Sequence, residues 1–124
     1  MIKKIFITSL LFFCISASAV EKKTNFSIEM LEKAKASGKT IVINSYEIWC
    51  GTCSKQIKVL DQAEKEFNEI IFLSYEQSKN KDIAKKLGIK QWTTIVVYKG
   101  ENEISRLIGQ TDKETIYSAI QKGI

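Results

Sequence analysis

The chain of 124 residues contains no histidine and no proline. Zinc sites draw their ligands largely from cysteine and histidine, so the missing histidines remove half of the usual donors. The missing prolines mean that no helix can be kinked by a proline ring. A long apolar run is also absent, because the uncharged stretch 5–20 is shorter than the roughly 18 to 20 residues of a membrane-spanning helix.

The first residues have the pattern of a secretory signal peptide. Lys3 and Lys4 give a positive start, residues 5–15 are mostly apolar, and Ala17-Ser18-Ala19 is a small-x-small cleavage signal. We predict a signal peptide over residues 1–19 that is cut after Ala19. The alternative is that the segment is retained as a single N-terminal membrane anchor.

Cleavage would leave one domain, residues 20–124, in the periplasm or outside the cell. It would also remove Cys14, so that Cys50 and Cys53 become the only thiols. The full chain has a formal net charge of +5, and two of its lysines lie in the leader. The remaining lysines alternate with acidic residues, which is typical of a solvated surface and not of nucleic-acid binding.

Hydrophobic periodicity predicts alternating helices and strands. Segments with one apolar face at helical spacing predict helices, and short β-branched runs predict strands. The last two strands form a hairpin, and a capping box over Thr111–Glu114 begins the last helix. The predicted helices cover 26–38, 53–67, 80–88 and the end of the chain after 111, and the predicted strands cover 41–44, 70–75, 93–98 and 103–108. This order predicts one α/β domain, with a mixed sheet and helices on both faces.

The sequence Cys50-Gly51-Thr52-Cys53 admits three uses: a metal site, a structural disulfide or a redox centre. A structural zinc site needs four ligands, and the mature chain offers two cysteines and no histidine. A structural disulfide here would close a very small loop and would therefore constrain the unfolded chain little. Redox chemistry is the interpretation that the surrounding sequence favours.

The cysteine pair follows a buried strand and begins an amphipathic helix. The positive end of the helix dipole stabilises a thiolate, and cysteine pKa values fall to roughly 3.5 to 7.5 in such settings. We expect Cys50, at the exposed tip, to attack a substrate disulfide, and Cys53, one turn deeper, to attack Cys50 and release the substrate. This chemistry needs no cofactor and no metal, and we predict neither.

Two segments resemble the thioredoxin family: GKTIVINSYEIWCGTCSKQIKVLDQAEKEF and IAKKLGIKQWTTIVVYKGENEISRLIGQ. The resemblance runs from about Phe26 to Ile120, and WCGTC is similar to the WCGPC site of the family. It implies the thioredoxin fold, with a mixed sheet of four to five strands. It also implies that Cys50 is the nucleophile, that Cys53 is the resolving thiol and that Trp49 flanks the site.

The first departure from the family is Thr93, which stands where thioredoxins carry a cis-proline. A cis bond before a residue other than proline costs about 2.5 to 4 kcal/mol, so we predict a trans Trp92–Thr93 bond. In the family this loop binds an extended substrate through its backbone. The predicted substrate-binding residues are Trp49, Gly51, Thr52, Trp92 and Thr93.

The second departure is Asn44, six residues before Cys50, where many thioredoxins place a buried aspartate that moves the proton of the resolving cysteine. Glu47 and Glu76 could substitute, although we expect both to be exposed and to form salt bridges. The third departure is Lys58, where thioredoxins often have a helix-kinking proline, so we expect a straighter helix.

The leading hypothesis is an exported thiol–disulfide oxidoreductase. Gly51-Thr52 contains no histidine to stabilise the Cys50 thiolate, which favours a reductant over an oxidant. We expect protein disulfide or dithiol substrates, a membrane-bound electron donor and a monomeric state. Two alternatives stay open: a thioredoxin-fold binding or chaperone module with a vestigial CxxC, and a metal or redox carrier whose site the missing proline opens.

Overall fold

The computed structural model describes residues 20 and 22–124, so the predicted leader, residues 1–19, lies outside the described part. Helices and strands alternate over the first half of the domain, and a strand hairpin followed by a helix closes it. The elements are α1 (Ile28–Ala36), β1 (Thr40–Tyr46), α2 (Gly51–Glu66), β2 (Ile70–Glu76), the short 3-10 helix η1 (Gln77–Lys79), α3 (Lys81–Leu87), β3 (Thr94–Lys99), β4 (Asn102–Ile108) and α4 (Lys113–Gln121).

The four strands form one mixed sheet in the order β2-β1-β3-β4. β1 and β2 are parallel, whereas β3 is antiparallel to both β1 and β4. The predicted hairpin is therefore confirmed, and so is the α/β class with a mixed sheet.

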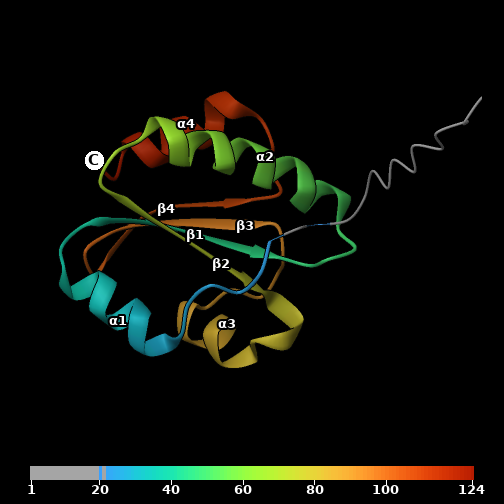
Figure 1. The fold of residues 1–124 in the computed structure, drawn as a ribbon, viewed down its shortest axis with the longest axis horizontal. Helices are drawn as coiled ribbons and strands as arrows, with labels where there is room; N and C mark the ends of the chain where they lie inside the picture. Colours follow the sequence, from blue (N-terminus) through green and yellow to red (C-terminus); the bar gives the residue numbers. More distant parts are fainter. Residues whose placement is uncertain (1–19, 21) are drawn as a thin grey trace, which may run out of the picture.

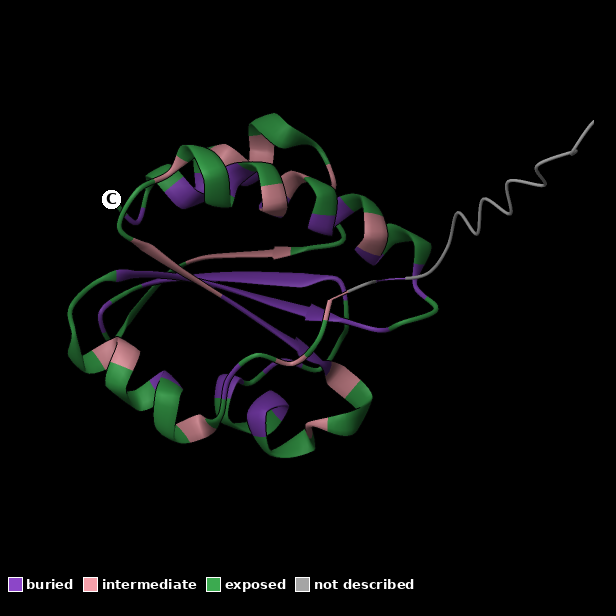
Figure 2. Cartoon of the chain, in the orientation of Figure 1, coloured by how far each residue is buried: buried purple, intermediate pink, exposed green. Residues whose placement is uncertain are grey.

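Helices cover both faces of this sheet (Figure 1). α2 and α4 lie on one face, and α1 and α3 lie on the other. Each face has its own apolar core, in which Leu31 and Ile83 are central on the α1/α3 side and Leu60 and Ile116 on the α2/α4 side. The strands at the centre are buried almost throughout, as Figure 2 shows. Among the described residues, no helix combines the length and the apolar character needed to cross a membrane.

β1 is longer than its apolar run predicts. All seven of its residues are buried, including the polar Asn44 and Ser45. Polar side chains can be buried where they find hydrogen-bond partners, and the Ser45 hydroxyl donates to the side-chain oxygen of Gln77 at 3.0 Å and to the carbonyl of Gln91 at 3.3 Å. These partners lie far away in the sequence, so local hydrophobicity could not reveal the last part of the strand.

The start of α4 corrects the predicted capping box. The N-cap is Asp112 and not Thr111: its carboxylate accepts a hydrogen bond from the backbone N–H of Thr115 at 2.9 Å. An aspartate cap satisfies a free N–H and interacts favourably with the helix dipole. Hydrogen bonds with the side chain of Thr115, and to a smaller extent with its backbone N–H, lower the pKa of Asp112 below its ordinary value.

Candidate active site

The two cysteines lie at the beginning of α2, directly after the loop that leaves β1. Cys50 is the N-cap residue, and its sulfur accepts a hydrogen bond from the backbone N–H of Cys53 at 3.1 Å. Cys50 and Cys53 form a disulfide, with their Cα atoms 5.2 Å apart. The first turn of α2 carries no acidic side chain, so no carboxylate of that turn offsets the positive end of the helix dipole at Cys50.

Cys50 is less accessible than a nucleophile at an exposed tip would be. Its exposed fraction is 6%, against 0% for Cys53. Both pack in a small apolar cluster with Val20, Tyr46 and Ile57. The expected order of depth is confirmed, but the prediction of an exposed Cys50 is wrong for this disulfide form, because distant segments of the chain cover it.

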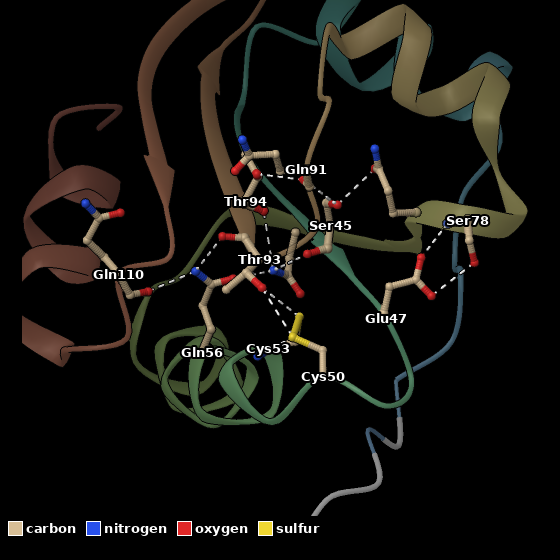
Figure 3. The surroundings of a disulfide bond; sticks show 12 residues. Ser45, Glu47, Cys50, Cys53, Gln56, Ser78, Gln91, Thr93, Thr94 and Gln110 are labelled. Atoms are coloured by element: carbon tan, nitrogen blue, oxygen red, sulfur yellow. Dashed lines mark hydrogen bonds between the residues drawn. A yellow bond between two sulfur atoms is a disulfide. The ribbon is translucent and has the colours of Figure 1, made fainter.

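Thr93 lies directly against the disulfide (Figure 3). Its Oγ1 is 3.3 Å from the sulfur of Cys50 and 2.9 Å from the sulfur of Cys53. The Trp92–Thr93 bond is trans, as predicted, and no peptide bond among the described residues is cis. The backbone at Thr93 is instead left-handed, with φ at 64°, a region that β-branched residues rarely enter.

The backbone of Thr93 is held at both of its polar groups. Its N–H donates to the carbonyl of Ser45 at 2.8 Å, and its carbonyl accepts from the N–H of Gly109 at 2.9 Å. The side chain of Gln56 adds a longer donation to the same carbonyl, at 3.3 Å. β1, α2 and the residue directly after β4 therefore fix this loop together.

Two exposed tryptophans border the site. Trp49 is 65% exposed and Trp92 is 43% exposed. Their ring centroids are 5.0 Å apart in an edge-to-face arrangement. The rim position expected for Trp49 agrees with this exposure, and Gly51 and Thr52 are also exposed, in the first turn of α2. All the predicted site residues thus gather around the disulfide, although their part in substrate binding stays a prediction.

Behind the cysteines lies a network of buried amides that sequence reasoning missed. Gln56 has no exposed surface; its side chain accepts from Asn44 Nδ2 at 2.8 Å and donates to the carbonyl of Gln110 at 2.9 Å. Figure 3 shows it reaching from α2 towards both Gln110 and Thr93. The available signal was its position three residues after Cys53, beside the apolar Ile57.

Asn44 occupies the buried position where the resemblance implies an acid. Its Oδ1 has no hydrogen-bond partner among the described residues. The residue lines a cavity of about 20 Å³ together with Leu60, Phe72 and the polar Lys22 and Glu64. A cavity of roughly 10 to 15 Å³ can hold one water molecule, which could donate to such an oxygen.

The carboxylates of the two candidate substitute acids bind groups other than the cysteines. Both Glu47 and Glu76 are buried, so the prediction that they are exposed is wrong. The carboxylate of Glu47 points towards Ser78 (Figure 3) and accepts from its N–H at 2.6 Å and from its hydroxyl at 3.0 Å. Glu76 forms an ion pair with Lys79 at 3.4 Å, so the expected salt bridge is present for this residue alone.

Tyr46 is the remaining titratable group packed against the cysteines. Burial, aided by the negative charge of Glu76, raises the pKa of Tyr46 to about 12. Its hydroxyl donates to the carbonyl of Lys22 at 2.8 Å. The phenol therefore stays neutral at the pH values at which thiols exchange, and its ring packs in the apolar cluster around the cysteines.

Comparison with known proteins places this arrangement in a family. The thioredoxin family model matches residues 17–122. The chain belongs to the thioredoxin family. Its relatives include the H-type thioredoxin of Fagopyrum esculentum, 29% identical over 89 residues that make up 72% of this chain and 77% of the relative. The thioredoxin of Echinococcus granulosus is 29% identical over 97 residues, or 78% of this chain and 89% of that protein.

Solved structures agree on the fold. A thioredoxin-like protein from Edwardsiella tarda superimposes with a TM-score of 0.74 at 21% identity, covering 77% of this chain and 94% of that one. Fasciola hepatica thioredoxin gives 0.69 at 24% identity, covering 78% and 91%. Thioredoxins are disulfide oxidoreductases, and this chain carries the CxxC pair of that chemistry at disulfide distance.

Proposed function

We propose that the chain is an exported thiol–disulfide oxidoreductase that reduces protein disulfides in preference to forming them. Cys50 attacks the substrate and Cys53 resolves the mixed disulfide. The preference for reduction is inferred from the groups that surround the Cys50 sulfur. Among the described residues its hydrogen-bond partners are the N–H of Cys53 and the hydroxyl of Thr93, both neutral groups.

Neutral donors stabilise a thiolate less than a cationic partner does. A strongly stabilised thiolate favours the reduced pair and makes the disulfide oxidising. We therefore expect a reduction potential nearer to about −270 mV than to about −120 mV, the values that mark reductants and strong oxidants in this fold. Equilibration with glutathione at known ratios measures it, and a value near the oxidising end would overturn the proposed direction.

Activity is tested by the reduction of insulin in the presence of dithiothreitol. We expect the wild-type chain to accelerate insulin precipitation and the Cys50→Ser variant to lose that acceleration. Equal rates for the two proteins would favour the alternative, a thioredoxin-fold binding or chaperone module whose cysteines are vestigial.

Export is supported by the charged start, apolar stretch and Ala17-Ser18-Ala19 signal of the leader. Expression of the full gene in a bacterial host should yield a soluble periplasmic protein whose mass corresponds to a chain starting at Val20. The Ala19→Lys variant should remain uncut. A wild-type chain of full length in the membrane fraction would indicate the single N-terminal anchor instead.

A periplasmic reductant has to be recharged, and we propose a membrane-bound electron donor. Trapping of the thiols in intact cells reports whether the pair is kept reduced. We expect a largely reduced pair while electron supply across the membrane works and a disulfide when that supply is blocked. A pair that stays oxidised in both conditions would argue against the donor.

A further inference from the structure

The hydroxyl of Thr93 faces the two sulfurs of the disulfide. Within the described residues, the hydrogen-bond partners of its hydroxyl are the two sulfurs, at 2.9 Å for Cys53 and 3.3 Å for Cys50. A disulfide sulfur carries no proton, so the hydroxyl is the donor, and its single proton is shared between the two sulfurs, with the shorter contact to Cys53. The donor therefore points at the atoms that react.

The backbone conformation at Thr93 is costly for such a residue. A β-branched side chain at φ 64° is strained, and strain of this kind persists only where the surroundings impose it. The hydrogen bonds to Ser45 and Gly109 hold the main chain in place. They do not use the hydroxyl, which is left to face the disulfide.

We propose that the Thr93 hydroxyl is a catalytic hydrogen-bond donor that stabilises negative charge on the sulfur of Cys53 during thiol–disulfide exchange. The proposal rests on the exchange chemistry of the Cys50–Cys53 pair, and it is independent of export and of the direction of electron flow. A donor gains strength when its acceptor becomes charged. Its effect is therefore larger on a thiolate than on the disulfide sulfur that it contacts here.

In the reducing direction, the Cys50 thiolate attacks one sulfur of a substrate disulfide. A Cys50–substrate bond forms, and the other substrate sulfur leaves with the electron pair. Cys53 then loses its proton to water and attacks Cys50, so that the chain becomes a disulfide and the second substrate sulfur leaves as a thiolate. The two substrate thiolates take up protons from water, and Thr93 stabilises Cys53 while it is ionised.

In the oxidising direction, a substrate thiolate attacks the Cys50 sulfur of the disulfide. A Cys50–substrate bond forms, the Cys50–Cys53 bond breaks, and Cys53 leaves with the electron pair. Its sulfur is then the charged atom 2.9 Å from Thr93 Oγ1. The second substrate thiolate then attacks the substrate sulfur of this mixed disulfide, so that the substrate disulfide forms and Cys50 leaves as a thiolate. The same donor thus serves both directions, at a site where Asn44 supplies no acid and Glu47 binds Ser78.

The donor acts on Cys53 only while that sulfur is charged. In the reduced pair Cys53 carries a proton until it attacks, so removal of the donor should affect mainly the rates at which the disulfide opens and closes, and the equilibrium less. The Thr93→Val variant keeps the shape and the β-branching of the residue but loses the hydroxyl, whereas Thr93→Ser keeps the hydroxyl. Thr40→Val is the matched control, because Thr40 is also a buried threonine and its hydroxyl donates to the carbonyl of Gly123.

The experiment measures the equilibrium constant of each protein with glutathione, together with the rate at which dithiothreitol opens the disulfide. For Thr93→Val we expect the opening of the disulfide to slow by roughly tenfold, because Cys53 leaves as a thiolate without its donor, and we expect the equilibrium to change by a smaller factor. Thr93→Ser should stay within about threefold of the wild type, and Thr40→Val should be unchanged, since a neutral hydrogen bond far from the sulfurs affects only stability.

Two results would overturn the proposal: a Thr93→Val variant that matches the wild type, or a Thr93→Ser variant shifted as far as Thr93→Val. Circular dichroism spectra and thermal unfolding show that each variant is folded. Glutathione and dithiothreitol react with the disulfide whatever its natural substrate is. A wild-type chain that fails to reduce insulin would therefore refute the proposed function. The measurements with glutathione and dithiothreitol would still test the role of Thr93.

Discussion

Asn44 uses only part of its hydrogen-bonding capacity behind the disulfide. Its amide nitrogen donates to Gln56 at 2.8 Å, while its Oδ1 has no partner among the described residues. Gln56 in turn contacts the carbonyls of Thr93 and Gln110. Asn44 is therefore connected through Gln56 to the loop of Thr93, whose hydroxyl faces the cysteines.

We expect Asn44→Asp to destabilise the fold at neutral pH by about 1 to 3 kcal/mol. The introduced carboxylate would be buried opposite the side-chain oxygen of Gln56, and turning the Gln56 amide would give up its donation to Gln110. Burial raises the pKa of such a carboxyl above its unfolded value, so the variant should lose stability as the pH rises above about 4. Urea unfolding at pH 4 and pH 7 measures this loss, and an equal effect at both values would contradict it.

The helices and strands could be predicted from the sequence wherever they depend on the local pattern of apolar residues. The apolar periodicity of α2 and the β-branched runs of β1 and β3 predicted these elements to within a few residues. The cover over Cys50 and the amide network of Gln56 were not predictable in this way. They depend on contacts of Cys50 and α2 with Thr93 and Gln110, which are distant in the sequence.

The segment before β3 also presents Trp92 to solvent beside Trp49. Exposed aromatic residues are frequent anchors of protein interfaces. We expect Trp92→Ala to raise the KM for insulin by about tenfold, as loss of an anchor of moderate strength would. The rate of reaction with oxidised glutathione should change little, because glutathione is too small to contact both Trp49 and Trp92.

Met30→Ala serves as the control for this prediction. Met30 is an exposed apolar side chain of α1, and α1 lies on the sheet face opposite α2 (Figure 1). A KM that rises equally in both variants, or a rise that also affects glutathione, would count against a docking role of Trp92.

At the scale of the whole molecule, the site joins segments from all parts of the described chain. Val20 packs against Tyr46 and Cys50, and the loop before β3 is held by β1 and by Gly109. Segments so far apart meet only in the folded domain. The chemistry of the cysteine pair therefore depends on overall stability as well as on the WCGTC sequence.

Overall stability should fall in strongly alkaline solution. Burial raises the pKa of both Tyr46 and Tyr75 from 10.0 to about 12. The folded state therefore keeps these protons between pH 10 and pH 12, where the unfolded chain loses them, so the free energy of unfolding decreases across that window. Urea titrations from pH 9 to pH 12 should show the decrease, and it should be smaller in Tyr46→Phe and Tyr75→Phe. A flat profile in the wild type would contradict it.

Trapping the mixed disulfide tests most directly whether Cys50 attacks the substrate and Cys53 resolves the complex. The Cys53→Ser variant is incubated in its reduced form with a protein disulfide substrate and analysed by mass spectrometry without reductant. We predict a covalent complex through Cys50 that dithiothreitol releases, and almost none with Cys50→Ser. If no complex forms, or if Cys50→Ser traps the substrate equally well through Cys53, Cys50 is not the attacking thiol.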